Sequence, residues 1–164
     1  MKQRLIALLL LLTVVWLTGC NRESSQEEAL QGPVYEPVST DETLREQLRR
    51  PLTDYLLALQ HQSYSELLLC AEEDFALCRD ETAFYDLTTG IEKATELHIM
   101  TDEVMKDNDG FLVRMQYELT RSGSFTDSSG ILQPPGTYEY DELFTLKQTD
   151  NGFLIADVRE TGDG

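Results

Sequence analysis

The stretch that decides the fold is residues 111–120, Phe-Leu-Val-Arg-Met-Gln-Tyr-Glu-Leu-Thr. Its odd-numbered positions are all large and apolar, while the even-numbered positions after Leu112 are polar or charged. Alternation with a period of two is typical of a β-strand that buries one face and exposes the other. The preceding Asp107-Asn108-Asp109-Gly110 favours a tight turn, because Asn and Gly tolerate positive φ angles. Together they predict one arm of a β-hairpin.

Three further segments after Gly90 have strand patterns, at residues 95–105, 138–147 and 153–159. Thr149-Asp150-Asn151-Gly152 separates the last two and predicts a second hairpin. A long connection that is rich in Ser, Gly and Pro, residues 121–137, joins the two hairpins. The C-terminal half therefore predicts a sheet of about four antiparallel strands.

Helical patterns come earlier in the chain. Apolar residues recur at the helical spacing over residues 44–59, after an N-cap at Thr40 or Asp41. Pro51 interrupts this pattern. It predicts that one helix ends at Arg50 and that Pro51 begins a second helix or a kinked continuation.

A third helix is predicted over residues 64–71 with Ser63 as its N-cap, and residues 75–85 form a further short helical or irregular segment. Helices that precede strands are typical of the α+β class. We therefore expect N-terminal helices packed on one face of a curved antiparallel sheet.

The first 19 residues predict a secretory signal peptide. Lys2 and Arg4 precede an uncharged, mostly leucine run over residues 5–17, which is shorter than the about 20 residues of a transmembrane helix. Leu17-Thr18-Gly19-Cys20 resembles the lipobox of lipoprotein signal peptidase: an aliphatic residue, two small residues and the lipid-accepting cysteine. The resemblance implies that Cys20 becomes a lipid-modified N-terminus. The alternative is an ordinary signal peptide with an unrelated cysteine.

This reading divides the chain into four parts. Residues 1–19 are the signal peptide, 20–39 the lipidated cysteine and a flexible tether, 40–160 the folded domain, and 161–164 a frayed end. Two or more acyl chains on Cys20 would give stable membrane anchoring, at about 0.8 kcal/mol per buried CH₂. We expect the protein on the extracytoplasmic side of a cell membrane. Sorting to an outer membrane stays open.

The balance of charge excludes one class of partner. Without Lys2 and Arg4, 11 basic residues face 30 acidic ones, which gives the mature chain a net charge of −19. So negative a surface argues against nucleic acid and against electrostatic adhesion to anionic lipid. The lipid on Cys20 would have to do the anchoring.

Two longer segments, residues 51–69 and residues 138–158, together resemble the NTF2-like superfamily, whose members have a cystatin-like α+β cone. Residues 51–69, PLTDYLLALQHQSYSELLL, are similar to its opening helix pair. Residues 138–147, YEYDELFTLK, and 150–158, DNGFLIADV, are similar to its closing hairpin. The resemblance spans residues 42–159 and implies the fold rather than an activity. It also implies that two copies can dimerise through their sheets.

Some enzymes of this superfamily place an acid or base inside the cone, and the sequence offers weak candidates for this role. Glu142 lies in phase with Tyr140 and Phe144, and its functional reading is a pocket acid. The alternative interpretation is a structural carboxylate: an edge residue, part of a bulge, or a group whose hydrogen-bonding needs are met by Arg114 or Tyr117. Two further candidates are His98, which faces outward if Leu97 and Ile99 face the core, and Asp157, in phase with Phe153 and Ile155. His61 is expected in an exposed connection.

Cys70 and Cys78 are the cysteines that remain beside Cys20, and two interpretations of them stay open. They could pair as a disulfide, since an exported protein meets oxidising conditions. They could also be two small buried hydrophobic residues. We expect no metal site and no cofactor, and the turn at residues 107–110 lacks the closing Glu of a calcium loop.

The last strand has an apolar residue on both faces, because Leu154, Ala156 and Val158 alternate with Phe153 and Ile155. A second apolar face needs cover from a second copy, a ligand or residues 121–137. Because the resemblance comes without a convincing acid/base set, we expect a non-enzymatic binding module in the cell envelope, which presents a pocket or sheet face to an envelope protein or a small ligand. The alternatives are an isomerase or dehydratase that uses Glu142, His98 or Asp157, and a structural spacer.

Overall fold

The computed structural model describes residues 35–107, 110–127 and 129–161. The predicted signal peptide, Cys20 and most of the predicted tether lie outside these ranges. The described residues belong to one compact unit, which begins at Tyr35. Its helices and strands follow in the order β1 (Glu36–Pro37), α2 (Glu42–His61), α3 (Tyr64–Cys70), α4 (Ala76–Arg79), α5 (Glu81–Thr88), β2 (Ile91–Ile99), β3 (Met105–Lys106), β4 (Phe111–Arg121), β5 (Phe125–Thr126), β6 (Leu132–Gln133), β7 (Gly136–Thr149) and β8 (Gly152–Glu160).

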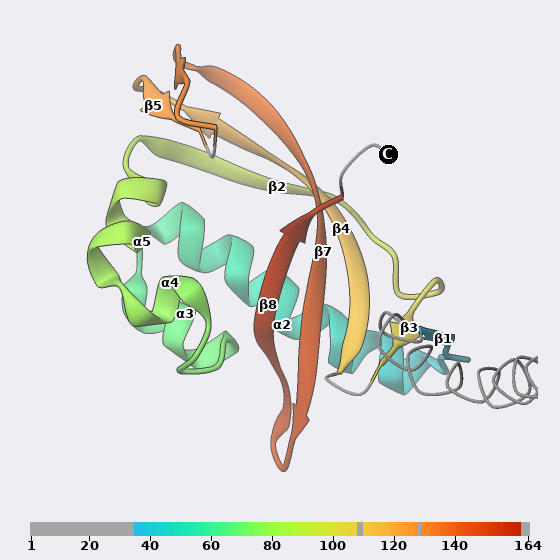
Figure 1. Cartoon of the computed structure of the whole chain (residues 1–164). Helices are drawn as coiled ribbons and strands as arrows, with labels where there is room; N and C mark the ends of the chain where they lie inside the picture. The colour runs from blue at the N-terminus through green and yellow to red at the C-terminus, as the bar shows by residue number, and fades with distance from the viewer. Residues whose placement is uncertain (1–34, 108–109, 128, 162–164) are drawn as a thin grey trace, which may run out of the picture. The chain divides into compact units, whose positions relative to one another are not determined.

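The centre of the sheet is β4, the strand with the clearest sequence pattern. It pairs with β7 along its whole length, and β8 continues the sheet beyond β7. On its other edge β4 pairs first with the short β3 and then with β2. All of these pairs are antiparallel, and Figure 1 shows the long strands curving together. The predicted α+β class with a curved antiparallel sheet is confirmed.

Two details of the sheet differ from the prediction. The segment expected at residues 95–105 is divided, because the N–H of Thr101 bonds to the carbonyl of Ile99 and turns the chain away from β4. β2 therefore ends at Ile99, and β3 takes its place beside the start of β4. Two short strands are added: β1, which pairs with β3, and a separate β5–β6 hairpin inside residues 121–137. β1 lies within residues 20–39, the segment expected to be a tether.

The helix does not end at Arg50: α2 is one helix of 20 residues, so the alternative of a continuation through Pro51 holds. Asp41 caps its start, with the N–H of Leu44 donating to Oδ1 at 2.8 Å, and Gln62 ends it in a left-handed conformation. A proline inside a helix costs about 3 kcal/mol. Burying one Leu side chain returns about 1.5–3 kcal/mol. The apolar side of α2 continues through Pro51, with these buried residues: Leu48, Leu52, Tyr55, Leu56 and Leu59.

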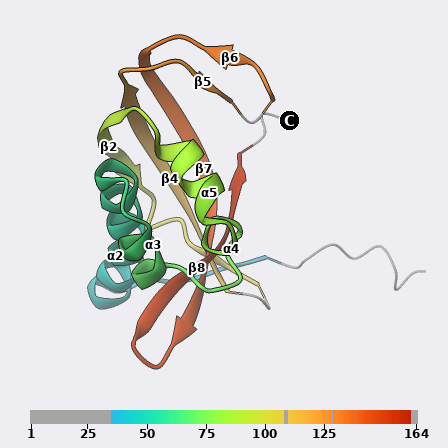
Figure 2. The same cartoon turned by 90° about the vertical axis from the view of Figure 1, so that its left-hand side faces the viewer.

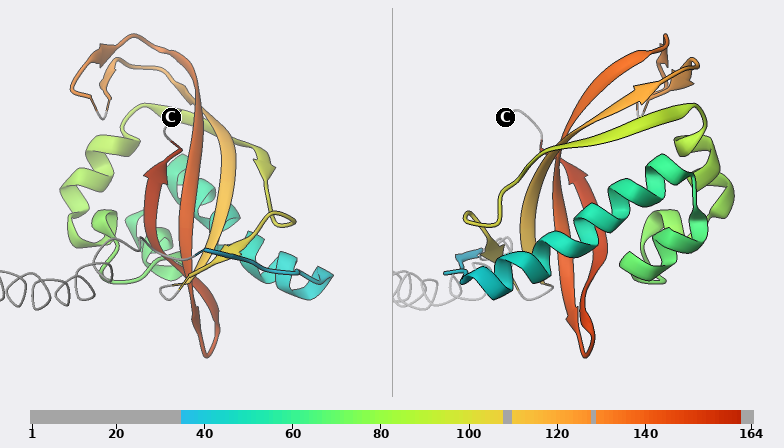
Figure 3. Two further views of the ribbon diagram at one scale, coloured as in Figure 1. Left: turned by 45° about the vertical axis from the view of Figure 1, so that its right-hand side comes forward. Right: turned by 180° about the vertical axis from the view of Figure 1, so that it is seen from behind.

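The core lies between the helices and one face of the sheet, which we call the inner face. Figure 3 shows α2 running diagonally across the sheet, and Figure 2 shows α3, α4 and α5 following on the same side. Tyr55 of α2 joins the layers: its ring packs edge-on against Phe144 of β7 at 5.5 Å and against Phe75 at 6.4 Å. Ser63 caps α3, as predicted, by accepting a bond from the N–H of Glu66.

Candidate functional site

The register of β4 and β7 places a carboxylate on the inner face. Met115 is opposite Glu142 and Tyr117 is opposite Tyr140, so these four side chains share one side of the sheet. The Tyr117 hydroxyl donates to Oε2 of Glu142 at 2.8 Å. Tyr117 and Tyr140 stack with their ring centroids 5.0 Å apart and an interplanar angle of 10°. The structure thus places Glu142 where its phase predicted, and Tyr117 satisfies it.

The electrostatics of this cluster follow from burial. Desolvation raises the pKa of Glu142; the Tyr117 hydroxyl opposes that rise, and the charge of Glu160, opposite it on β8, adds to it. Burial also raises the pKa of Tyr117 and of the neighbouring Tyr55, with Glu142 contributing to both. The two phenols are therefore proton donors at neutral pH. The cluster can hold a hydrogen-bonded carboxylate or carboxylic acid inside the fold.

The other catalytic candidates are not brought to this cluster. His98 is exposed and lies opposite Gln116, on the outer face of the sheet. His61 is exposed at the end of α2, with Nδ1 2.8 Å from Oε2 of Glu66. Asp157 is exposed and pairs with Arg159 at 3.7 Å. Of these residues, the structure places only Glu142 on the inner face.

A β-bulge explains the position of Asp157. Thr145 pairs with Asp157 and the next residue, Leu146, pairs with Ile155, so Ala156 is an extra residue in β8. The extra residue reverses the alternation beyond it. Asp157 therefore faces outward, and Val158, opposite Phe144, packs against the core. The prediction that Asp157 shares a face with Phe153 and Ile155 is therefore wrong. The prediction of a second apolar face made by Leu154, Ala156 and Val158 is also wrong, because Val158 lies on the inner face.

The outer face of the central strands is polar. Arg114 donates to both carboxylate oxygens of Asp141, from Nε at 2.7 Å and from Nη2 at 2.5 Å. Gln116 donates to the same carboxylate. Chiefly through Arg114, these bonds hold the pKa of Asp141 well below its ordinary value.

Cys70 and Cys78 are both buried, and both are free thiols. Burial raises the pKa of Cys70 to about 12, with a further contribution from the charge of Asp54. Its Sγ donates to the carbonyl of Leu67 at 3.3 Å. Their surroundings are those of the second interpretation of this pair, two small side chains packed in the core.

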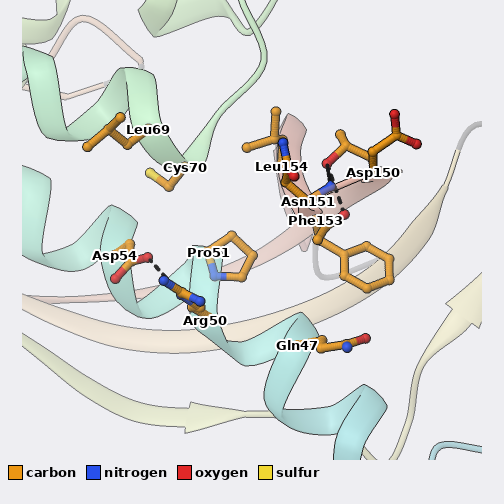
Figure 4. Close-up of a pocket in the computed structure, with 12 residues that line it drawn as sticks. Gln47, Arg50, Pro51, Asp54, Leu69, Cys70, Asp150, Asn151, Phe153 and Leu154 are labelled. Carbon is orange, nitrogen blue, oxygen red and sulfur yellow. Dashed lines mark hydrogen bonds and ion pairs between the residues drawn. The ribbon is translucent and has the colours of Figure 1, made fainter.

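A pocket of about 920 Å³ lies between α2, the end of α3 and the β7–β8 turn (Figure 4). We call it the hairpin pocket. Pro51, Leu69 and Leu154 give it apolar surface, and Arg50 lies 3.9 Å from Asp54 on its wall. Its lining does not include Glu142, His98 or Asp157; the lining residues are Gln47, Arg50, Pro51, Asp54, Leu69, Cys70, Thr149, Asp150, Asn151, Gly152, Phe153 and Leu154.

A second pocket of about 550 Å³ lies next to it and shares Leu154. Leu68 lines this second pocket, and Leu69 lines the hairpin pocket. Both leucines are exposed to solvent, Leu68 by 45% and Leu69 by 80%. We call Leu68, Leu69 and Leu154 the leucine patch. The sequence held a signal for it: neighbouring residues on a helix point about 100° apart, so Leu67, Leu68 and Leu69 cannot all face one core.

Neither a metal site nor a membrane span is found in the part of the chain that the structure describes. Within residues 35–107, 110–127 and 129–161, His, Cys, Asp and Glu form no group of three that could hold a metal ion. No helix in those same ranges is long and apolar enough to cross a membrane.

Comparison with known proteins gives likeness in structure only. No family model matches the chain, and no curated protein matches it. A Nuclear transport factor 2 (NTF2-like) superfamily protein from Salmonella enterica serovar Typhimurium is 12% identical, with a TM-score of 0.49, over 74% of this chain and 96% of that chain. TsrD from Streptomyces laurentii is 14% identical, with a TM-score of 0.45, over 76% and 92%. Identities this low say nothing about activity.

Proposed function

We propose that this chain is a lipid-anchored lipoprotein of the extracytoplasmic membrane surface, and that its NTF2-like domain is a non-enzymatic module that binds a segment of another envelope protein. The anchor rests on the sequence alone, on the run from Leu17 to Cys20 behind an apolar stretch. The binding surface rests on the leucine patch and the two pockets beside it.

The observation that carries the proposal is the exposure of Leu69. A side chain that is 80% exposed gains little from the fold, yet Leu69 lines the hairpin pocket. Its neighbour Leu68 lines the second pocket, and Leu154 lines both pockets. Exposed apolar side chains that gather at pockets are typical of interaction sites.

The charges around the patch suggest the chemistry of the partner. Asp150 lies on the rim of the hairpin pocket, and Glu73 lines the second pocket, without an ion pair to any described residue. Nearby Glu72 already holds Lys147 at 2.8 Å. We infer that the partner segment offers leucine-sized apolar side chains to the pockets and a Lys or Arg to the free carboxylates.

The surroundings of Glu142 on the inner face fit a structural role better than a catalytic or binding role. Glu142 already accepts a bond from Tyr117, whose side chain is 2% exposed. His98 and Asp157 lie on exposed surface away from it. Neither of the other two predicted catalytic candidates, His98 and Asp157, therefore lies next to Glu142 as a second acid or base.

The experiment is site-specific photocrosslinking in the native host. Leu69→p-benzoylphenylalanine should give one discrete crosslinked product, and the matched Leu57→p-benzoylphenylalanine should not. Leu57 is similarly apolar and is 43% exposed, but it lines neither pocket. The purified partner should then bind L68S/L69S at least about tenfold more weakly than it binds the wild type or L57S. Equal products at both positions, or equal affinities, would contradict the proposal.

One observation favours the enzymatic alternative: desolvation raises the pKa of Glu142 beside two phenols that remain proton donors. An isomerase or dehydratase needs a base of that kind. Incubation with cyclohexanone in heavy water would reveal it, because a base that removes α-protons exchanges them for deuterium. Exchange that E142Q abolishes would replace the binding module by an enzyme. Exchange no faster than in buffer would leave the binding proposal in place.

A further inference from the structure

Arg121, the last residue of β4, is a buried cation that forms no ion pair with a carboxylate of the described residues. Its exposure is 2%. Nη1 donates to the carbonyls of Leu87 at 2.7 Å and Thr89 at 3.3 Å, at the C-terminal end of α5. The ring of Phe125 lies against the guanidinium, with its centroid 4.1 Å from Cζ. These contacts occupy one nitrogen and one planar face of the group.

The remaining edge of the guanidinium is unused. Nε and Nη2 are both buried, and neither has a hydrogen-bond partner among the residues that the structure describes. None of the ion pairs in the described ranges includes Arg121, although the chain has 30 acidic residues. Buried polar groups in proteins are almost always paired, and a buried charge most of all.

A second arginine of the same strand shows what this edge binds. Arg114 uses Nε and Nη2 together to hold both oxygens of Asp141. Two parallel N–H donors match the two oxygens of a carboxylate, which is why arginine recognises that group in a bidentate manner. Arg121 keeps the equivalent edge free inside the fold.

The groups around this edge are aromatic and bear few charges. Tyr140 lies on the inner face near Arg121, and the charge of Arg121 and its side-chain contact with the phenol both counteract the rise that burial causes in the tyrosine pKa. Neither Nε nor Nη2 has the phenol within hydrogen-bond geometry. Tyr138 packs edge-on against Phe125 at 5.0 Å. Gly136, opposite Arg121 across the sheet, has no side chain and lies against the Tyr138 ring. A flat organic group suits such walls better than an inorganic ion does.

The cover over Arg121 is separable from the main sheet. Phe125 belongs to the β5–β6 hairpin, whose strands pair with each other and with no strand of the main sheet. Ile131 and Leu132 at its end are exposed, and Figure 2 shows the hairpin beyond the end of the helices. Moving it would break none of the pairs that hold β4 to β7.

We propose that the Nε–Nη2 edge of Arg121 binds the carboxylate of a small planar organic acid, which enters when the β5–β6 hairpin moves aside. The hairpin then closes Phe125 over the flat body of the acid, beside the Tyr138 ring of β7. This site shares no residue with the leucine patch or the hairpin pocket. Failure of one proposal therefore leaves the other intact.

Benzoate is the probe, and benzamide is its uncharged counterpart of the same shape. The measurement is the ¹H–¹⁵N NMR signal of the Arg121 Nε–H group in the full mature domain, assigned by comparison with R121K. Benzoate should move this signal downfield in a saturable way, with a Kd on the order of 1 mM or lower. Benzamide should leave it in place.

Two variants separate a binding role from a structural one. R121K keeps the charge near the α5 carbonyls but loses the two-pronged edge, and it should weaken benzoate binding at least about tenfold. R114K, the matched change on the outer face, should bind as the wild type does. An Arg121 signal that stays fixed under benzoate, or that benzamide moves equally, would overturn the proposal without the use of any variant. So would equal affinities of a folded R121K and the wild type.

Discussion

The Tyr117 hydroxyl lies 2.8 Å from Oε2 of Glu142, and this bond joins β4 to β7 on the inner face of the sheet. It is the only side-chain hydrogen bond that Glu142 makes within the described residues. The pair is consequently sensitive to loss of either member.

The first prediction concerns the donor of this bond. Y117F should lower the free energy of unfolding by about 1–3 kcal/mol, because it leaves a half-buried carboxylate without its partner. The pKa of Glu142 should rise further, since the lost bond is the one that lowers it. Urea denaturation and carboxyl NMR titration measure the two effects. Y85F is the control, because Tyr85 is 44% exposed. A Glu142 pKa unchanged in Y117F would contradict the prediction.

The second prediction concerns pH. The fold raises the pKa of Glu142, so the folded protein holds this proton more tightly than the unfolded chain does. The resulting stabilisation is complete below the ordinary pKa of 4.5 and is lost as the pH rises through the raised value. E142Q, which stays neutral, should therefore lose less stability than the wild type over that interval. Parallel curves of unfolding free energy against pH would show that Glu142 is not desolvated.

The third prediction concerns Asp141, whose pKa the fold lowers instead of raising. The fold lowers the pKa of Asp141, mainly through Arg114, so its stabilisation is complete above 3.8 and is lost as the pH falls toward the lowered value. D141N should cost about 1 kcal/mol at neutral pH, a modest figure because the pair is partly exposed. The difference from the wild type should shrink in acid. A constant difference at all pH values would contradict this assignment.

The fourth prediction tests the β-bulge with two adjacent substitutions. V158D should lower the free energy of unfolding by about 2–4 kcal/mol, because it places a charge against the core. D157V should change it by about 0.5 kcal/mol or less, because Asp157 is exposed. In a strand without the bulge Val158 would face outward, and V158D would then cost about 0.5 kcal/mol or less. Thermal denaturation of the two variants therefore decides the register.

The fifth prediction concerns the proposed anchor. C20S should release the protein from the membrane fraction and abolish incorporation of labelled palmitate, because serine lacks the thiol that forms the thioether. C70S serves as the control for loss of a cysteine and should remain membrane-bound. Membrane association of C20S equal to that of the wild type would refute lipid anchoring at this residue.

Local patterns determined much of this fold. The alternation over residues 111–120 specified β4 and its inner face, because strand periodicity is written into consecutive residues. The turn over residues 149–152 and the caps Asp41 and Ser63 are local in the same way. Glu142 was placed on the inner face by its phase alone, and Tyr117 was among the partners that this phase allowed.

Tertiary structure decided the features that depend on contacts between distant segments. α2 passes through Pro51 because the sheet buries both halves of its apolar side. The bulge at Ala156 exists only in the pairing of β8 with β7, and no pattern within β8 reveals it. Arg121 becomes a buried cation only when α5 and Phe125 close around the end of β4. The sequence therefore determined most of the long elements and the inner faces of β4 and β7. Burial and pairing across the chain determined the faces of β8 and the candidate sites, since those energies arise only when remote residues meet.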